Sequence, residues 1–442
     1  VGLLVNDLTA AARWLNIILF GALTALTGWF FARQTGRTWL AAALAGLIAC
    51  SPVVVGVQVW AMSEPLFLLL GFASLLLLLD HFEAPRWQKL AAAAVLAGLA
   101  FLTRYMGAAF IGAAGLALLF FGRGSKIFTA PRGAQIREAL WFGAVSLAPM
   151  AIWLAVDFSL TGTVASRSGQ PAEAYWQRFL EMGPALQKIV LFWLVPDSII
   201  DRLPRAAQAA LWLIPLAAAA VTAWLLIRRR PAGLNHTSGG LLSSRLASPA
   251  RLAVLFGLFI VVYLIVLAVV QVFTYPPITL ASRMLSPVHL AVLVLALALA
   301  HLGVSVCEPC SDLAIGIVSL AILGLLGSYL LRSVMIVRDY HQDGIGYNSR
   351  AWRESQVIEA VRALPANTPL ISNEVTAIMY LTGRPAYALQ EIYQDRPLEQ
   401  FTVYGTGDDV PQRVFRQQNG ALVLFDANLR EDFSMYGDRV DQ

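Results

Sequence analysis

The stretch Trp60-Ala61-Met62-Ser63-Glu64-Pro65 places a carboxylate at the start of a long apolar run that extends over 66–79. Pro65 suits the first turn of a helix, where its missing N–H costs no hydrogen bond. Ser63 is suited to cap that helix, and the helix dipole favours the negative charge of Glu64. Two interpretations of Glu64 stay open. It is a simple cap of a membrane span, or it is a functional group, because ionisable side chains at membrane depth are costly and usually have a role.

The composition is that of a polytopic membrane protein. Of the 442 residues, 58% are hydrophobic and only 13% are charged, whereas a soluble domain has roughly 25% charged residues. The mean hydropathy is +0.66. The formal net charge is +5, but the distribution of the charges carries more information than their sum. We expect a lipid bilayer as the surroundings of this chain, and no nucleic-acid partner.

Apolar runs long enough to cross a hydrocarbon core of roughly 30 Å recur along most of the chain. The run 90–121 is different, because as one helix it would be about 48 Å long. It is interrupted by Arg104-Tyr105-Met106-Gly107, which predicts two short helices that meet there, with Gly107 supplying unusual backbone angles. With these two, roughly ten spans are predicted, the others lying near 14–32, 39–58, 65–80, 139–158, 207–227, 251–272, 285–303 and 313–332.

The basic residues predict the orientation of these spans, because cytoplasmic loops carry an excess of Lys and Arg. Such residues gather in three connections, and more weakly in a fourth, which we expect to be cytoplasmic: 33–37, 122–138, 228–251 and 81–89. The connection 304–312, which has two acids and no Lys or Arg, argues mildly for the opposite orientation.

This orientation puts Glu64, Arg104, Arg283 and a long loop at 159–206 on the outer side, together with everything beyond Arg332. Within the loop, 184–200 is interpreted either as an interfacial helix on the bilayer or as a loop that packs over the bundle.

Beyond residue 340 the pattern becomes that of a soluble fold. Residues 351–364 predict an amphipathic helix, and 370–372 and 421–425 predict short buried strands. Residues 374–382 and 410–418 predict further helices between strands. The sequence therefore predicts a mainly α protein with two parts: a transmembrane helical domain over 1–335 and a small extracytoplasmic α/β domain over 340–442.

The polar residues on the predicted outer side suit a lipid-linked phosphate. Arginine binds phosphate through a planar fork of donors that is always charged, and a carboxylate acts as a general base or orients an acceptor hydroxyl. The alternative is that the arginines snorkel to lipid headgroups while Glu64 pairs with one of them. The candidate residues are Glu64, Arg104, Tyr105, Tyr275 and Arg283, with weaker contributions from Gln58 and Gln271.

No metal site is predicted. The five histidines are scattered, and Cys307-Glu-Pro-Cys310 lacks the second pair of ligands that a zinc site needs. We expect no cofactor, and the pattern leaves a requirement for a divalent metal open.

Several short motifs, taken in order, resemble the GT-C membrane glycosyltransferases. The similarity is to the branch of the protein O-mannosyltransferases, the lipid A aminoarabinose transferase and related bacterial proteins. The motifs are Ala12-Arg13-Trp14-Leu15-Asn16, Ser63-Glu64-Pro65-Leu66, Ala97-Gly98-Leu99-Ala100-Phe101-Leu102-Thr103-Arg104-Tyr105-Met106-Gly107, Ser282-Arg283-Met284-Leu285-Ser286-Pro287 and, in the tail, Ile371-Ser372-Asn373 with Tyr380-Leu381-Thr382-Gly383-Arg384.

The resemblance implies an inverting transfer of a sugar from a polyprenyl-phosphate carrier to an acceptor on the outer side of the plasma membrane. Glu64 resembles the second acidic residue of the family. Arg104 and Arg283 resemble basic residues near the lipid phosphate, although Met284 stands where the family pattern has Tyr.

The family also has a first span, and a first outer loop with the principal catalytic acid, ahead of the stretch that matches this chain. Asp7 lies too close to the first visible span to be that acid. We therefore expect either a truncated chain or an inactive homologue.

Two other functions stay open. A transporter or flippase of lipid-linked substrates is favoured by the broken run 90–121, because discontinuous helices mark transporter sites. A non-catalytic membrane protein whose tail binds a partner is the third possibility.

Overall fold

The computed structural model describes residues 8–60, 62–120, 132–161, 168–169, 175–200, 202–204, 240–275, 280–306, 311–388 and 419–425. These residues are mainly helical, and the chain divides into two compact units, Val1–Ile336 and Val337–Gln442.

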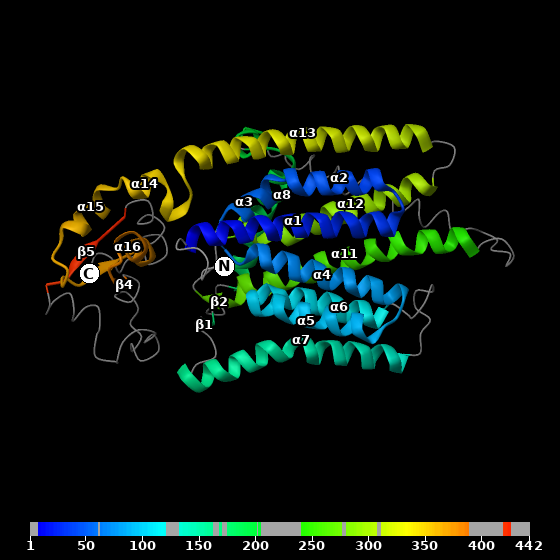
Figure 1. Cartoon of the computed structure of the whole chain (residues 1–442), viewed down its shortest axis with the longest axis horizontal. Helices are drawn as coiled ribbons and strands as arrows, with labels where there is room; N and C mark the ends of the chain where they lie inside the picture. Colours follow the sequence, from blue (N-terminus) through cyan, green and yellow to red (C-terminus); the bar gives the residue numbers. More distant parts are fainter. Residues whose placement is uncertain are drawn as a thin grey trace. The chain divides into compact units, whose positions relative to one another are not determined.

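The long helices of the first unit lie side by side along a common direction (Figure 1). A two-residue antiparallel pair joins β1 (Ser168–Gly169) to β2 (Thr274–Tyr275). The helices are α1 (Leu8–Thr35), α2 (Thr38–Cys50), α3 (Pro52–Val59), α4 (Glu64–Glu83), α5 (Trp87–Thr103), α6 (Ala108–Phe120), α7 (Arg132–Thr161), α8 (Tyr175–Leu194), α9 (Asp197–Ile200), α11 (Gly240–Phe273), α12 (Ser286–Val306) and α13 (Ser311–Asp343), with the 3₁₀ turns η1 (Tyr105–Gly107) and η3 (Ser282–Leu285).

Six helices among the described residues are long and apolar enough to cross a bilayer, and α2 with α3, bent by 51° at their break, makes a seventh if the pair is one span. The six segments are Ala10–Thr35, Glu64–Glu83, Gly133–Leu160, Ser248–Phe273, Ser282–Ser305 and Asp312–Asp343. The predicted fold class, a mainly helical membrane protein, is confirmed. The span expected near 207–227 lies outside the described residues.

The run 90–121 forms two short helices, as predicted, with η1 between α5 and α6. The reason given for Gly107 was wrong, because its backbone does not take a positive φ. Its role is close approach: a Cβ at this position would lie 2.3 Å from Cα of Phe101 and 2.4 Å from its backbone nitrogen. Only glycine lets the chain turn this tightly against the end of α5.

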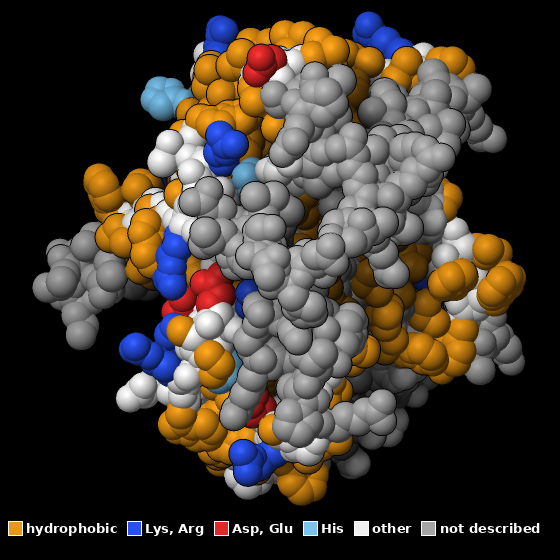
Figure 2. Space-filling view, turned by 90° about the vertical axis from the view of Figure 1, so that its right-hand side faces the viewer, with side chains coloured by type: hydrophobic (Ala, Val, Ile, Leu, Met, Phe, Trp, Pro, Cys, Tyr) orange, Lys and Arg blue, Asp and Glu red, His pale blue; other side chains and the backbone are white. Residues whose placement is uncertain are grey.

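Described residues in or next to three of the connections predicted to be cytoplasmic (33–37, 81–89 and 228–251) meet at the end of the bundle opposite Glu64. Arg33 pairs with Asp80, and Nζ of Lys89 lies 2.6 Å from Oδ2 of Asp80. Oγ of Ser248 donates to Glu83 at 2.8 Å, and Nη1 of Arg251 donates to the carbonyl of Phe82 at 3.2 Å. These contacts join the ends of α1, α4, α5 and α11. Figure 2 looks at this end and shows blue and red side chains gathered together.

The segment 184–200, interpreted either as an interfacial helix or as a loop that packs over the bundle, is helical over most of its length. The helix α8 begins at Tyr175, ends at Leu194 and contains Pro184. In its second half Leu191 and Trp193 are buried, and Trp193 belongs to the core of the bundle, whereas Trp176 near its start is 69% exposed. The apolar residues near 190 therefore pack against the bundle.

The second unit contains a parallel sheet with the strand order β4-β3-β5. Its elements are η5 (Gly346–Asn348), α14 (Arg350–Arg353), α15 (Gln356–Ala363), β3 (Leu370–Ser372), α16 (Val375–Thr382), β4 (Tyr387–Ala388) and β5 (Ala421–Val423). The helix predicted over 410–418 lies outside the described residues, and β5 ends two residues before the predicted strand end.

The single helix predicted over 351–364 is wrong, because Ser355 is extended and separates α14 from α15. Trp352 packs against Phe425, with ring centroids 4.9 Å apart, and Ile358 belongs to the same core. In one continuous helix these two residues would lie about 120° apart, so the break lets both face the core. Nearby, Tyr347 donates to Glu374 at 3.1 Å, and burial together with this carboxylate raises the pKa of the Tyr347 phenol.

We expect Gly107→Ala to lower the thermal stability of the detergent-purified protein, because the new Cβ must displace backbone of Phe101. Strain of this kind costs about 1–3 kcal/mol. The matched control is Gly115→Ala in α6, where a Cβ meets nothing within 4 Å and alanine favours the helix. Equal melting temperatures for the two variants would contradict this account of the turn.

Candidate functional site

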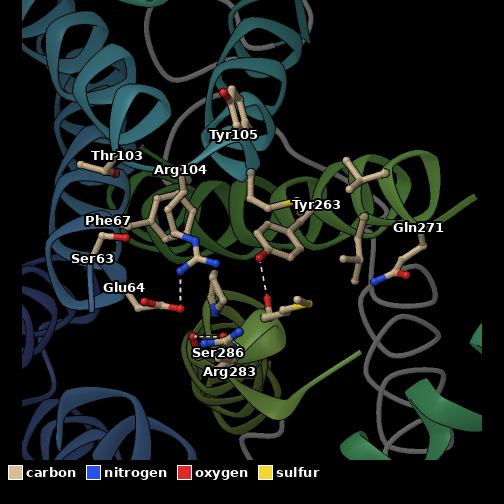
Figure 3. A pocket seen from close by; sticks show the side chains of 15 residues that line it. Ser63, Glu64, Phe67, Thr103, Arg104, Tyr105, Tyr263, Gln271, Arg283 and Ser286 are labelled. Carbon is tan, nitrogen blue, oxygen red and sulfur yellow. Dashed lines mark hydrogen bonds and ion pairs between the residues drawn. The ribbon is translucent and has the colours of Figure 1, made fainter. Parts of the chain in front are cut away.

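A cavity of about 420 Å³ lies at the end of the helical unit where α4 and α12 begin. Its volume falls within the range of small-molecule sites. Five structural features converge on it: the first turn of α4, the corner between α5 and α6, the last turns of α11, η3, and the start of α12. The lining residues are Ser63, Glu64, Phe67, Thr103, Arg104, Tyr105, Met106, Tyr263, Leu267, Val270, Gln271, Arg283, Met284, Ser286 and Pro287 (Figure 3).

Glu64 and Arg104 form an ion pair on one wall of the cavity (Figure 3). Glu64 is the first residue of α4 and only 3% exposed. Arg104 follows the last residue of α5 with an extended backbone, and 27% of its side chain is exposed. Because Arg104 sits at the break between two helices, its guanidinium reaches a carboxylate that is 40 positions earlier in the sequence.

The carboxylate of Glu64 has acceptor capacity to spare. Within the described part of the chain, Arg104 is its one ion-pair partner, and neither buried carboxylate oxygen accepts a well-aligned hydrogen bond. The prediction that Ser63 caps α4 is wrong, because its side chain makes no capping hydrogen bond and its backbone is helical. Glu64 is therefore held by the arginine beside it on the same wall of the cavity.

Arg283 reaches the same cavity from η3. Its guanidinium is exposed, and Nη1 donates to Sδ of Met62 at 3.1 Å. No carboxylate among the described residues lies within ion-pair distance of it. The backbone of η3 is fixed from two sides, because Tyr263 donates to the carbonyl of Met284 at 2.5 Å and Ser286 donates to that of Arg283 at 2.7 Å. With two guanidinium groups and one carboxylate, the described lining carries one net positive charge.

Of the two tyrosines named from the sequence, Tyr105 lines the cavity but stays apart from the ion pair. Tyr105 is 67% exposed, and its ring points away from the ion pair in Figure 3. Tyr275 belongs to β2, but its side chain lies outside the described residues. Of the two weaker candidates, Gln271 lines the cavity and Gln58 does not.

The sequence did not single out Tyr263, Ser286 or Met62 as members of this region. Tyr263 lies in the middle of the apolar run that forms α11 and is 1% exposed. A hydroxyl group inside such a run was the one signal that marked it, since a buried tyrosine needs a hydrogen-bond partner. Nothing in the sequence marked Ser286 and Met62 as site residues, except that they lie close to Arg283 and Glu64.

A family model described as dolichyl-phosphate-mannose-protein mannosyltransferase matches residues 2–153. The matched segment contains Glu64 and Arg104, and Arg283 lies beyond it. No curated protein and no solved structure matches the chain. The family match confirms the resemblance to GT-C membrane glycosyltransferases and supports a membrane glycosyltransferase of this type.

We expect Glu64 and Arg104 to be energetically coupled. Removing one partner of a mostly buried pair leaves the other charge uncompensated, so Glu64→Gln and Arg104→Gln should each lower stability by about 1–3 kcal/mol. The double variant should lose less than the sum. The measurement is denaturant unfolding in detergent, with Glu181→Gln, from an exposed pair with Arg178, as a control that changes stability little. Additive losses would show that the pair is not coupled.

Proposed function

We propose that this chain, similar to GT-C membrane glycosyltransferases, transfers a sugar from a polyprenyl-phosphate carrier to an acceptor on the outer side of the plasma membrane. The observation that carries the proposal is the cavity where Glu64, Arg104 and Arg283 meet at the ends of apolar helices. At this place a lipid tail remains in the bilayer while its phosphate reaches charged groups.

The two arginines bind the phosphate of the donor. Arg283 is exposed and faces no carboxylate among the described residues, so its charge is available to an anion. The Arg104 side chain is oriented by Glu64 and keeps part of its surface open to the cavity. Guanidinium groups favour phosphate because they present several fixed donors. The start of α12, directly after η3, adds the favourable end of a helix dipole.

The transfer is a single displacement. The acceptor hydroxyl attacks the anomeric carbon, and the bond between that carbon and the phosphate oxygen breaks with inversion. Polyprenyl phosphate leaves with the bonding electron pair, and the arginines stabilise the negative charge that develops on it. Glu64 has unused acceptor capacity, so it holds the acceptor hydroxyl by a hydrogen bond and takes its proton as the new bond forms.

Gln271 supports a place for the sugar. It is 7% exposed, it lines the cavity, and its amide nitrogen has no hydrogen-bond partner among the described residues. Figure 3 shows it away from the ion pair, beyond Tyr263. An unpaired buried amide is costly unless a ligand satisfies it. We therefore assign the charged end of the cavity to the phosphate and the Gln271 end to sugar hydroxyl groups.

The distribution of basic residues supports the sidedness. The Arg- and Lys-bearing connections at 33–37 and 81–89 lie at the end of the bundle opposite the cavity. Since such loops remain in the cytoplasm, the cavity opens on the outer side. By the same rule we place the second unit, which follows α13, outside the membrane on that side.

A flippase for lipid-linked sugars is the second candidate. The breaks between α2 and α3 and between α5 and α6 favour it, since discontinuous helices line many transporter sites. A flippase moves the donor across the bilayer and leaves every acceptor unmodified.

The test is transfer of labelled sugar from a panel of polyprenyl-phosphate sugars to membrane extract by the purified protein in liposomes. We expect Arg104→Gln, Arg283→Gln and Glu64→Gln each to lower transfer about 10- to 100-fold, because each removes a charged hydrogen-bonding group. Native mass spectrometry with polyprenyl phosphate reports whether the arginine variants lose the carrier.

Arg86→Gln is the matched control, because it removes the same charge from an exposed position at the other end of the bundle. Normal transfer by the Glu64→Gln/Arg283→Gln double variant would overturn the assignment of residues. Labelled donor that crosses the bilayer with no acceptor modified would establish the flippase instead.

A further inference from the structure

Asn16 makes two hydrogen bonds, one buried and one partly buried, that connect α1 to the chain ahead of Glu64. The residue is 4% exposed. Its side-chain nitrogen donates to the carbonyl of Gln58 at 3.1 Å and to the carbonyl of Trp60 at 2.7 Å. Both partners are acceptors, so only the amide NH₂ group, with its two hydrogens, can serve them.

These bonds satisfy the end of α3, which stops at Val59. The last carbonyl groups of a helix have no partner within the helix. In a membrane protein a buried carbonyl that lacks a partner is especially costly, because no water replaces the missing donor. Asn16 thus allows α3 to end inside the protein, and it fixes the direction in which the chain leaves.

The chain that leaves α3 leads directly to the cavity. The carbonyl of Trp60 also accepts from the backbone N–H of Met62 at 2.8 Å, which closes a tight turn. Sδ of Met62 accepts from Nη1 of Arg283. Two residues later the chain enters α4 with Glu64. Asn16 of α1 therefore anchors this turn. The turn precedes Glu64, and its residue Met62 contacts Arg283.

We propose that Asn16 is a positioning residue for the cavity: it holds the 60–62 turn so that Met62 and Glu64 meet Arg283 and Arg104. Asn16 does not line the cavity and acts through the turn alone. The ligand part of this inference rests on the proposed function, whereas the effect on the turn does not.

The test compares Asn16→Leu and Asn16→Asp with the wild type in detergent. Both variants are close in size to asparagine and lack the two donors, and aspartate also sets an acceptor against two carbonyls. Hydrogen–deuterium exchange should show that the amides of residues 62–67 exchange about tenfold faster in both, because the anchor of the turn is gone. Binding of polyprenyl phosphate, measured by native mass spectrometry, should weaken about tenfold, because the released turn no longer holds Met62 and Glu64 against the two arginines.

Ser146→Ala is the matched control. Oγ of Ser146 is fully buried and donates to the carbonyl of Ala94 at 3.0 Å, between α7 and α5. Its loss should lower the melting temperature as the Asn16 variants do, yet leave both the exchange of 62–67 and the binding of polyprenyl phosphate unchanged. This contrast separates positioning from a general loss of stability.

Unchanged exchange of 62–67 in both Asn16 variants would overturn the proposal, whatever happens to binding. An effect in Asn16→Asp alone would also overturn it, because the introduced charge and not the lost donors would then be the cause. If the wild type fails to bind polyprenyl phosphate, the proposed function falls, and the exchange measurement still decides the role of Asn16.

Discussion

The ion pair between Glu64 and Arg104 is the interaction around which the helical unit is arranged. Burying a carboxylate that is 3% exposed is costly unless a cation compensates its charge. That cation is available because α5 ends at Thr103 and the chain turns at η1 before α6. A continuous helix through 90–121 would have had no break at residue 104 from which this side chain could reach the cavity. The broken helix and the buried charge therefore require each other.

The charged groups of the cavity come from places where a regular helix begins or ends. The α3–α4 turn brings Met62 and Glu64, the α5–α6 corner brings Arg104, and η3 brings Arg283. Helix ends carry unpaired backbone groups, and the protein satisfies them with side chains that also shape the site. Asn16 donates hydrogen bonds to carbonyl groups at the end of α3, and Tyr263 donates one to the carbonyl of Met284 in η3. The same few hydrogen bonds thus satisfy backbone carbonyl groups and shape the cavity.

The two ends of the bundle differ in how their charges are used. At the end with the basic connections, Asp80 contacts both Arg33 and Lys89, so acids and bases neutralise one another and tie helices together. At the cavity end, two arginines face a single carboxylate within the described lining, and Nη1 of Arg283 donates to the sulfur atom of Met62. The first arrangement stabilises the bundle. The second leaves positive charge available for an anionic ligand, which is the electrostatic basis of the proposed function.

The sequence by itself determined the membrane class, most of the long apolar helices of the first unit, the break at 104–107, and the three charged residues that line the cavity, because hydropathy and the cost of buried charge are local properties. Only the tertiary structure decided which carboxylate pairs with which arginine, and that Gly107 is needed for close approach, since both depend on distances between helices. The hydrogen bonds of Tyr263 and Asn16 could not be predicted from the sequence either. Each is an ordinary polar residue in an apolar helix until its partner, a backbone carbonyl more than 20 positions away, is placed beside it.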